Sequence, residues 1–187
     1  MKQEELDKIE NELKKRWDFP YEWGRIQNDV WDRHSSFIYS TSSWDILRQK
    51  CEDAVKSNGL NRREFLNYAF NRWYNYWSAV AVEKIFTTLP GIVPEFNKTN
   101  RLVDFNFFGK DFDLKTSVFP KGFGRDLTYC REHPEELILW LYKNQSAQQR
   151  QHYANRLFLI VFSEAGNHWK LKAEISWLKQ IVTEYVA

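Results

Sequence analysis

The sequence predicts a mixed α/β protein in which helices accompany a small β-sheet and a helical extension precedes both. Two observations carry this prediction. Residues 1–60 place apolar side chains at helical spacing, whereas beyond residue 90 short alternating segments, separated by turn residues, are interleaved with helical ones. We therefore expect a helical N-terminal extension at residues 1–60 and an α/β core at residues 61–187, together in one compact domain.

Two helices are predicted in the N-terminal extension. Residues 4–17 carry an apolar stripe at helical spacing, which ends at an aromatic connection. A second helix is expected at residues 43–57, where Ser43 is a capping residue and Gly59 a stop signal.

The predicted core begins with a long helix and continues with strands. The helix follows the cap residue Asn61, has Glu64 at the capping-box position, and ends before Pro90 and Gly91. The elements expected after it are strands at 92–96, 101–108 and 111–118, a helix at 135–143 extended or followed by 147–155, strands at 156–162 and 168–172, and a terminal helix to Tyr185. The order from residue 61 is thus α-β-β-β-α-β, followed by β-α.

Composition excludes several classes of protein. The longest apolar run, residues 157–162, is too short to span a bilayer, and the charged N-terminus shows no signal peptide, so we expect a cytoplasmic protein without a membrane partner. The two cysteines and four histidines lack the spacing of a zinc site. A net charge of +2 neither requires nor excludes a nucleic-acid partner.

Aromatic residues make up 17% of the chain, with nine Trp, nine Tyr and fourteen Phe. Most of these rings are expected in a dense core, since each buries a large area. Individual rings could instead stack on unpaired bases of a nucleic acid.

Residues 101–118 are typical of a β-hairpin, with a two-residue turn expected at Gly109 and Lys110. Side chains alternate between the two faces of each strand. The face expected in the core carries Val103, Phe105, Phe107, Phe112, Leu114 and Val118, and the polar face carries Asp104, Asn106, Asp111, Asp113, Lys115 and Ser117. The expected turn pairs Asn106 with Asp113 and Asp104 with Lys115, so that Asp104 and Asp113 become diagonal neighbours.

Two carboxylates and an ammonium group on rigid strands have a chemical use. The oxygens of Asp104 and Asp113 can bind a hard cation such as Mg²⁺, which polarises a phosphodiester and lowers the pKa of a bound water. The Lys115 ammonium can orient that water and stabilise the charge that develops on phosphorus. The alternative is a solvated hairpin face, on which Asp104 and Lys115 form an ordinary cross-strand ion pair.

The segment resembles the PD-(D/E)xK nuclease superfamily, whose signature is an acid on one strand followed by (D/E)-x-K on the next. Asp104 matches the first acid, and Asp113 and Lys115 match the second element around Leu114. Glu83, near the end of the long helix, is similar to the acid that the family often adds from the preceding helix. Val103 stands where the signature often has proline, which makes the match less specific. The α-β-β-β-α-β order of residues 61–162 also suits the family.

The resemblance implies a restriction-endonuclease-like core and a Mg²⁺-dependent endonuclease acting on DNA phosphodiester bonds, with Mn²⁺ as a substitute and RNA left open as a substrate. Asp104, Asp113 and Glu83 would ligate the metal, and Lys115 would position the attacking water. A homodimer would provide the second site needed to cut both strands.

Five basic residues outside the hairpin are candidate DNA contacts. Lys121 and Arg125 follow the hairpin in a glycine-containing segment, and Arg62, Arg63 and Arg72 lie on the long helix. A solvated turn and a charged helix face are the alternatives. Two other function classes stay open: a non-catalytic nucleic-acid-binding module on the same fold, and a protein that binds partners through its Trp-rich helices.

Overall fold

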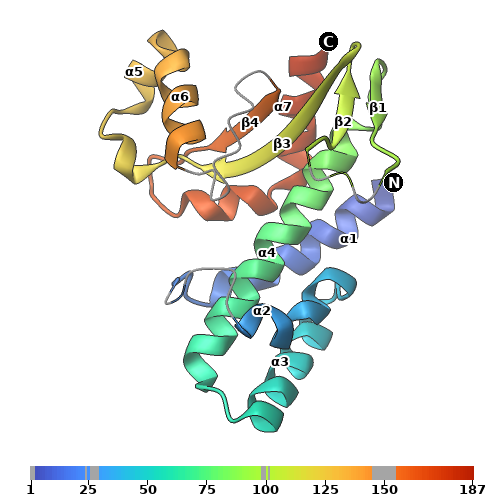
Figure 1. Cartoon of the computed structure of the whole chain (residues 1–187), viewed down its shortest axis with the longest axis vertical. Helices are drawn as coiled ribbons and strands as arrows, with labels where there is room; N and C mark the ends of the chain where they lie inside the picture. The colour runs from blue at the N-terminus through green and yellow to red at the C-terminus, as the bar shows by residue number, and fades with distance from the viewer. Residues whose placement is uncertain (1–2, 24, 26–29, 98–99, 101, 145–154) are drawn as a thin grey trace. The chain divides into compact units, whose positions relative to one another are not determined.

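Helices make up most of the described chain, and four strands lie between residues 92 and 161. The computed structural model describes residues 3–23, 25, 30–97, 100, 102–144 and 155–187. The chain divides into a helical unit, formed by Met1–Ile85 and Lys172–Ala187, and a sheet unit, Phe86–Leu171 (Figure 1).

The helical unit is built from helices whose ends follow local sequence signals. Its α-helices are α1 (Gln3–Lys14), α2 (Val30–His34), α3 (Trp44–Asn58), α4 (Arg62–Phe86) and α7 (Ile175–Val186), with 3-10 turns η1 (Lys15–Asp18), η2 (Ser36–Ser40) and η4 (His168–Ala173). The Asn61 side-chain oxygen accepts the Glu64 N–H at 3.2 Å and caps α4, and α3 ends at Gly59, which has φ +60°. The sequence predicted both of these signals.

Aromatic side chains fill the core of the helical unit. The Trp44 ring of α3 lies 4.6 Å from Phe70 and 5.5 Å from Trp73 of α4, measured between ring centroids. Trp73 is fully buried, and its Nε1–H donates to the Thr41 carbonyl oxygen at 2.6 Å. The middle turns of α4 therefore pack on the N-terminal helices.

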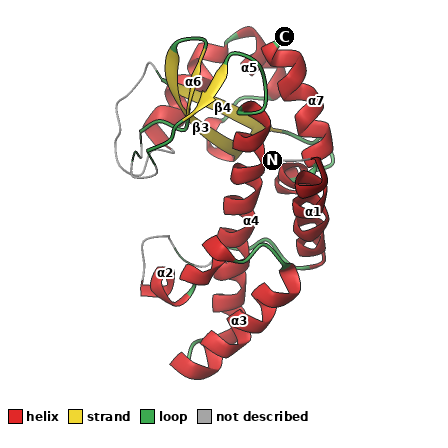
Figure 2. Cartoon of the chain, turned by 90° about the vertical axis from the view of Figure 1, so that its right-hand side faces the viewer, coloured by secondary structure: helices red, strands yellow, loops and turns green. Residues whose placement is uncertain are grey.

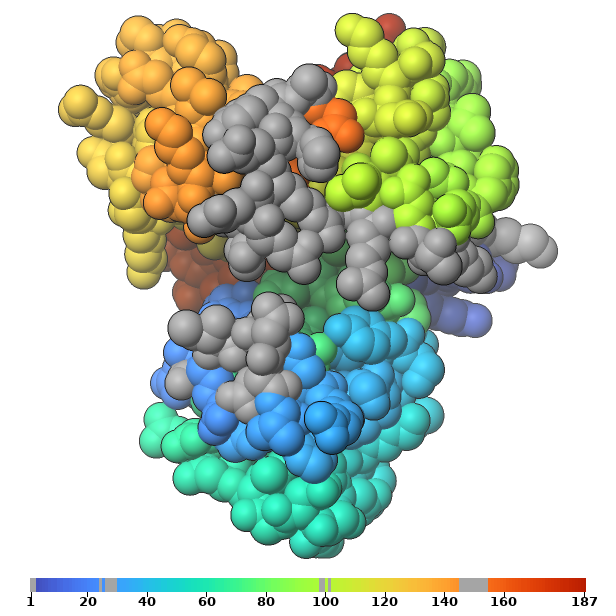
Figure 3. Space-filling view, viewed as in Figure 1, coloured from blue at the N-terminus to red at the C-terminus, as the bar shows by residue number. Residues whose placement is uncertain are grey.

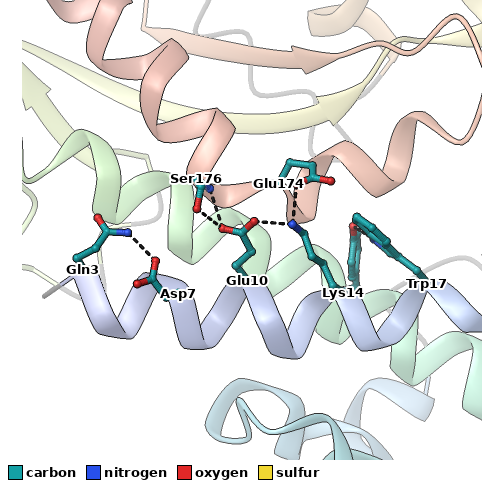
Figure 4. A network of polar contacts seen from close by, with 8 residues as sticks. Gln3, Asp7, Glu10, Lys14, Trp17, Glu174 and Ser176 are labelled. Carbon is teal, nitrogen blue, oxygen red and sulfur yellow. Dashed lines mark hydrogen bonds and ion pairs between the residues drawn. The ribbon is translucent and has the colours of Figure 1, made fainter.

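The C-terminal helix α7 docks on α1 through polar contacts (Figure 4). Glu10 accepts hydrogen bonds from the Ser176 N–H and hydroxyl at 2.9 and 2.5 Å, and Lys14 forms ion pairs with Glu10 (2.6 Å) and Glu174 (2.7 Å). Burial alone would raise the pKa of Glu10, but the hydrogen bonds from Lys14 and Ser176 hold it below its ordinary value. The two ends of the chain thus belong to the same unit.

The sheet unit carries a four-stranded mixed sheet. Its elements are β1 (Ile92–Pro94), β2 (Phe105–Phe107), β3 (Lys110–Val118), η3 (Lys121–Phe123), α5 (Leu127–Glu132), α6 (Pro134–Asn144) and β4 (Arg156–Val161). The strand order is β1-β2-β3-β4; the first three strands are antiparallel, and β4 lies parallel to β3 (Figure 2). The connection between β3 and β4 contains α5 and α6, since parallel strands need a long crossover. The prediction of a mixed α/β protein is confirmed.

The β2–β3 hairpin turns one residue earlier than the sequence predicted. Phe107 pairs with Lys110, and the turn residues Phe108 and Gly109 have φ of +46° and +88°. The turn expected at Gly109 and Lys110 is wrong, because a type I′ turn needs positive φ at both central positions and Gly109 supplies the second of them. The pairing shifts by two residues, and because side-chain direction has a period of two, each side chain keeps its predicted face.

The faces of the hairpin confirm this reasoning. Phe105 and Leu114 are buried, and the Phe105 ring stacks on Phe86 at 5.2 Å. The other predicted core residues are half-buried: Val103, Phe107, Phe112 and Val118. Asn106 lies opposite Asp111 instead of Asp113.

Three other predictions fare differently. Residues 168–172, predicted as a strand, form η4, because His168 Nδ1 accepts the Ser163 N–H at 2.8 Å and turns the chain back. Residues 147–154 lie outside the described part of the chain. The units divide at residues 85/86 and 171/172 instead of residue 60, since α4 packs on the N-terminal helices.

Among the helices described, none is long and apolar enough to cross a membrane.

Candidate functional site

Asp113 and Lys115 lie two residues apart on β3 and therefore point to the same face of the sheet. The Lys115 ammonium nitrogen is 2.7 Å from Asp113 Oδ1. The Asp113 side chain is only 6% exposed, whereas that of Lys115 is 45% exposed. The pair thus consists of a buried acid and a cation that reaches solvent.

Arg156 is the second partner of Asp113, and sequence reasoning missed it. The parallel pairing of β3 and β4 places Arg156 beside Asp113, and Arg156 Nε lies 2.8 Å from Asp113 Oδ2. The Arg156 side chain is 5% exposed. Both Asp113 oxygens are therefore paired with cations: Oδ1 with Lys115 of the same strand, and Oδ2 with Arg156 of β4. The only sequence signal was a charged residue at the start of an otherwise apolar strand.

Helix α6 covers this part of the sheet with Tyr142. The Arg156 guanidinium lies 5.7 Å from the centroid of the Tyr142 ring, and the Tyr142 hydroxyl accepts the Arg156 N–H at 3.0 Å. The Tyr142 ring also meets the Phe158 ring edge-on at 5.3 Å. These contacts exclude water from the Arg156–Asp113 pair, which strengthens their attraction.

Asp104 reaches the same place from the residue before β2. Its N–H donates to the Phe112 carbonyl oxygen at 2.8 Å, and its Oδ2 accepts the Leu114 N–H at 2.7 Å. The carboxylate thus replaces a backbone acceptor at the end of the β2–β3 ladder. Asp104, Asp113 and Lys115 come together as predicted, on adjacent antiparallel strands.

The environment makes Asp104 a weaker acid than an ordinary aspartic acid. Burial raises the pKa of Asp104 above its ordinary value, and the charge of Asp113 raises it further. The Leu114 N–H and the Lys115 charge oppose the shift without cancelling it. Two carboxylates held this closely compete for protons, and a cation that binds both would relieve their repulsion.

Glu83 lies in α4, within the helical unit, and is half-buried. Burial raises the pKa of Tyr76, and the charge of Glu83 adds to that shift, so Glu83 lies near Tyr76. Within the described residues, no three or more His, Cys, Asp or Glu side chains are grouped closely enough to hold a metal ion. Asp104 and Asp113 supply two hard oxygen donors of the kind that Mg²⁺ takes. The role of Glu83 as a further ligand stays a prediction.

The predicted DNA contacts of the sheet unit are exposed. Lys121 lies in η3 and Arg125 follows it, in the connection that leaves the carboxyl end of β3. The Arg125 guanidinium lies 5.0 Å from the centroid of the Tyr129 ring. Both cations are accessible to a phosphate.

The three arginines of α4 differ in exposure. Arg62 and Arg63 are exposed and form ion pairs with Glu52 and Glu22. Arg72 is 6% exposed; its guanidinium donates to Ser35 Oγ and Tyr39 OH and forms an ion pair with Asp32 at 3.3 Å. Because those acceptors occupy its donors inside the helical unit, we leave Arg72 out of the proposed DNA contacts.

Comparison with known proteins found no match: no protein-family model, no curated protein and no solved structure is similar to this chain. The resemblance to PD-(D/E)xK nucleases therefore rests on the residues of the hairpin and on the order of the elements. The function has to be inferred from the geometry of the site.

Proposed function

We propose that the protein is a metal-dependent endonuclease that hydrolyses DNA phosphodiester bonds at Asp104, Asp113 and Lys115. The observation that supports this function best is the convergence of the three side chains on adjacent strands. Lys115 Nζ lies 2.7 Å from Asp113 Oδ1, and the charge of Asp113 helps to raise the pKa of Asp104. Acids whose pKa is perturbed by burial and by a charged neighbour are candidates for functional sites.

The order of the elements supports a restriction-endonuclease-like fold. A long helix, α4, precedes three antiparallel strands, and the crossover that contains α5 and α6 leads to β4, parallel to β3. The sequence predicted α-β-β-β-α-β, and the structure has a further helix, α5, between β3 and α6. The fold assignment belongs to the proposal, along with the function.

The side chains divide the work of hydrolysis. A Mg²⁺ or Mn²⁺ ion held by Asp104 and Asp113 would polarise the phosphodiester and acidify a water molecule. Arg156 holds the Asp113 carboxylate in a fixed orientation through its Nε. Lys115, the exposed member of the cluster, can turn from Asp113 toward the substrate, where it orients the attacking water and stabilises the charge on the phosphate oxygens.

The competing function is a non-catalytic nucleic-acid-binding module. One observation favours it: Lys115 and Arg156 already pair with both oxygens of Asp113, as they would in a purely structural ion cluster. Metal-dependent cleavage separates the two functions, because only the nuclease needs the cation for its chemistry.

A plasmid-nicking assay with Mg²⁺, combined with calorimetric titration of the metal, tests the proposal. Lys115→Ala should reduce nicking about 10²–10⁴-fold, the usual range for a lost acid–base group, while DNA binding persists. Asp113→Asn should remove both metal binding and cleavage. Glu83→Gln should weaken Mg²⁺ affinity if Glu83 is a ligand, and equal affinity would remove it from the site.

The matched control is Lys110→Ala. Lys110 lies on the same strand at the hairpin turn, is exposed, and has no place in the proposed site. Its substitution should leave nicking unchanged. A wild-type rate from Lys115→Ala would move the chemistry to other residues.

A further inference from the structure

Phe96 is the most exposed large hydrophobic side chain in the described part of the chain, at 80%. It lies two residues after the end of β1. Figure 3 shows the green to yellow-green part of the chain, which includes β1 and β2, at the surface of the face in view. Its ring makes no ring contact with another described residue. A phenyl ring this exposed contributes little to folding and is accessible to a ligand.

The chain around Phe96 is held in place by hydrogen bonds. The Glu95 carboxylate accepts the Asn97 N–H and the Asn100 side-chain amide, each at 2.7 Å. The Asn100 N–H donates to the Asn97 carbonyl oxygen at 2.9 Å, and the Asn100 side-chain oxygen accepts the Leu102 N–H at 3.0 Å. The hydrogen bond from the Asn97 N–H, followed by that from Asn100, keeps the pKa of Glu95 below its ordinary value. Hydrogen bonds thus fix Glu95 and Asn97, on either side of Phe96, which reduces the entropy lost on binding.

The position of Phe96 connects it with the candidate site. The Glu95 N–H donates to the Asp104 carbonyl oxygen at 2.9 Å, which extends the β1–β2 ladder by one pair. Paired residues have Cα atoms roughly 5 Å apart and consecutive ones 3.8 Å, so the Phe96 Cα lies within about 10 Å of that of Asp104. The backbone at Phe96 therefore lies close to the backbone that carries the Asp104 carboxylate.

We propose that Phe96 stacks on a base next to the scissile phosphate, and that the substrate is DNA in which this base is unpaired. The proposal rests on the proposed function and names the substrate class of that site. A base inside a duplex is covered on both faces and paired, whereas a base in a single strand, a flap, a gap or a frayed end offers a free face. Stacking on an aromatic ring does not depend on the identity of the base. The site is therefore selective for DNA structure and not for sequence.

Fluorescence anisotropy without divalent metal measures this binding apart from cleavage. The probes are labelled oligothymidylate, a blunt duplex of the same length, and an abasic strand that keeps the sugar-phosphate chain. Phe96→Ala should weaken oligothymidylate binding about 10–100-fold, the range found when a stacking ring is removed, and should leave duplex and abasic binding within twofold. Phe96→Trp should restore binding to oligothymidylate.

The matched control is Phe108→Ala. Phe108 is 65% exposed and lies in the turn at the opposite end of β2, where its ring covers Gly91. Its substitution should leave all three affinities unchanged. Thermal melting of each variant checks the fold, which an exposed ring should not alter.

Three results would overturn the inference. They are oligothymidylate binding by Phe96→Ala at the wild-type level, an equal loss of abasic-strand affinity in that variant, and no binding of oligothymidylate by the wild-type protein. Plasmid nicking reports on the proposed function separately. Nicking that depends on Lys115 while Phe96→Ala binds normally would remove only the stacking role. Phe96-dependent binding without nicking under any divalent metal would support the stacking role and remove the hydrolysis.

Discussion

Arg16 in the helical unit and Asp113 in the sheet unit are both buried, charged side chains, but they have different kinds of partner. In the helical unit, Arg16 donates to the carbonyl oxygens of Phe19 and Pro20 and to the Asn71 side chain, at 2.6–2.7 Å. Burial lowers the pKa of Arg16 to about 10. These three acceptors are uncharged, and through them the guanidinium ties the segment after α1 to α4 at a cost in solvation.

In the sheet unit the buried charges meet one another. Asp113 is paired with Arg156 and Lys115, and Asp104 is forced close to Asp113, where its pKa is raised. Ion pairs that only hold β3 and β4 together would need Asp113 but not the second carboxylate, Asp104. Arg16 thus fits a role in holding segments together, whereas Asp104 and Asp113 in the sheet unit are two carboxylates that repel one another, an arrangement that functional sites also use.

The largest effect on stability should come from the arginine with a charged partner. Arg156→Met leaves the buried Asp113 with only the exposed Lys115 and should destabilise the protein by about 3–5 kcal/mol. Arg16→Met leaves uncharged acceptors without donors and should cost about 1–3 kcal/mol. Urea unfolding followed by circular dichroism measures both.

The control for this pair is Arg62→Met. Arg62 forms an ion pair with Glu52 at the surface, so its loss should cost less than about 1 kcal/mol. Equal costs for Arg156→Met and Arg16→Met would break the comparison, because the charge of the partner would then not matter.

The hairpin explains why the three site residues could be predicted from the sequence. The turn lies at Phe108 and Gly109, one residue before the expected place, and the register shifts by two. A shift of two preserves the face of every side chain, so Asp104, Asp113 and Lys115 still converge. Local alternation was therefore sufficient to predict that these three side chains share a face, although it did not predict which residues pair across the two strands.

Arg156 could not be predicted in the same way. Its position beside Asp113 depends on the parallel register of β3 and β4, which the long crossover sets and which no local pattern encodes. The grouping of α4 with the N-terminal helices is equally non-local, because it depends on packing such as that of Trp44 on Trp73. The prediction of a strand at residues 168–172 was wrong for another reason: over five residues, alternation alone does not distinguish a strand from a 3-10 turn.

Lys172 offers a second way to sharpen the comparison, through pH. It is buried in the helical unit, its Nζ donates to Asn75 Oδ1 at 2.6 Å, and burial lowers its pKa to about 8 from an ordinary 10.5. Between these values the unfolded chain binds more protons than the folded one, so stability rises with pH. Across that window the wild-type protein should gain about 3 kcal/mol relative to Lys172→Met.

Urea unfolding at pH values from 7 to about 10.5 measures the difference between the wild-type protein and Lys172→Met. The difference is the useful quantity, since tyrosines also titrate at the upper end; burial raises the pKa of Tyr74, for example. A constant difference across the window would mean that Lys172 stays charged in the folded protein and has an anionic partner, as the cations of the sheet unit do.

The smallest effect should have the opposite sign. Asp104→Asn keeps an oxygen for the Leu114 N–H but removes the repulsion from Asp113, so it should stabilise the protein at neutral pH, by about 1 kcal/mol. The raised pKa means that the folded protein holds the Asp104 proton more tightly than the unfolded chain does.

Protonation of Asp104 therefore stabilises the wild-type protein. This stabilisation is complete below the ordinary pKa of 3.8 and is lost as pH rises through the folded pKa, so the advantage of Asp104→Asn should shrink toward acid pH. Melting temperatures at neutral and acidic pH test this, with Asp111→Asn, at the exposed start of the neighbouring strand β3, as the control. A variant that is more stable but no longer nicks DNA would show that the carboxylate is kept for chemistry; a loss of stability at neutral pH would make Asp104 a structural residue like Asn71.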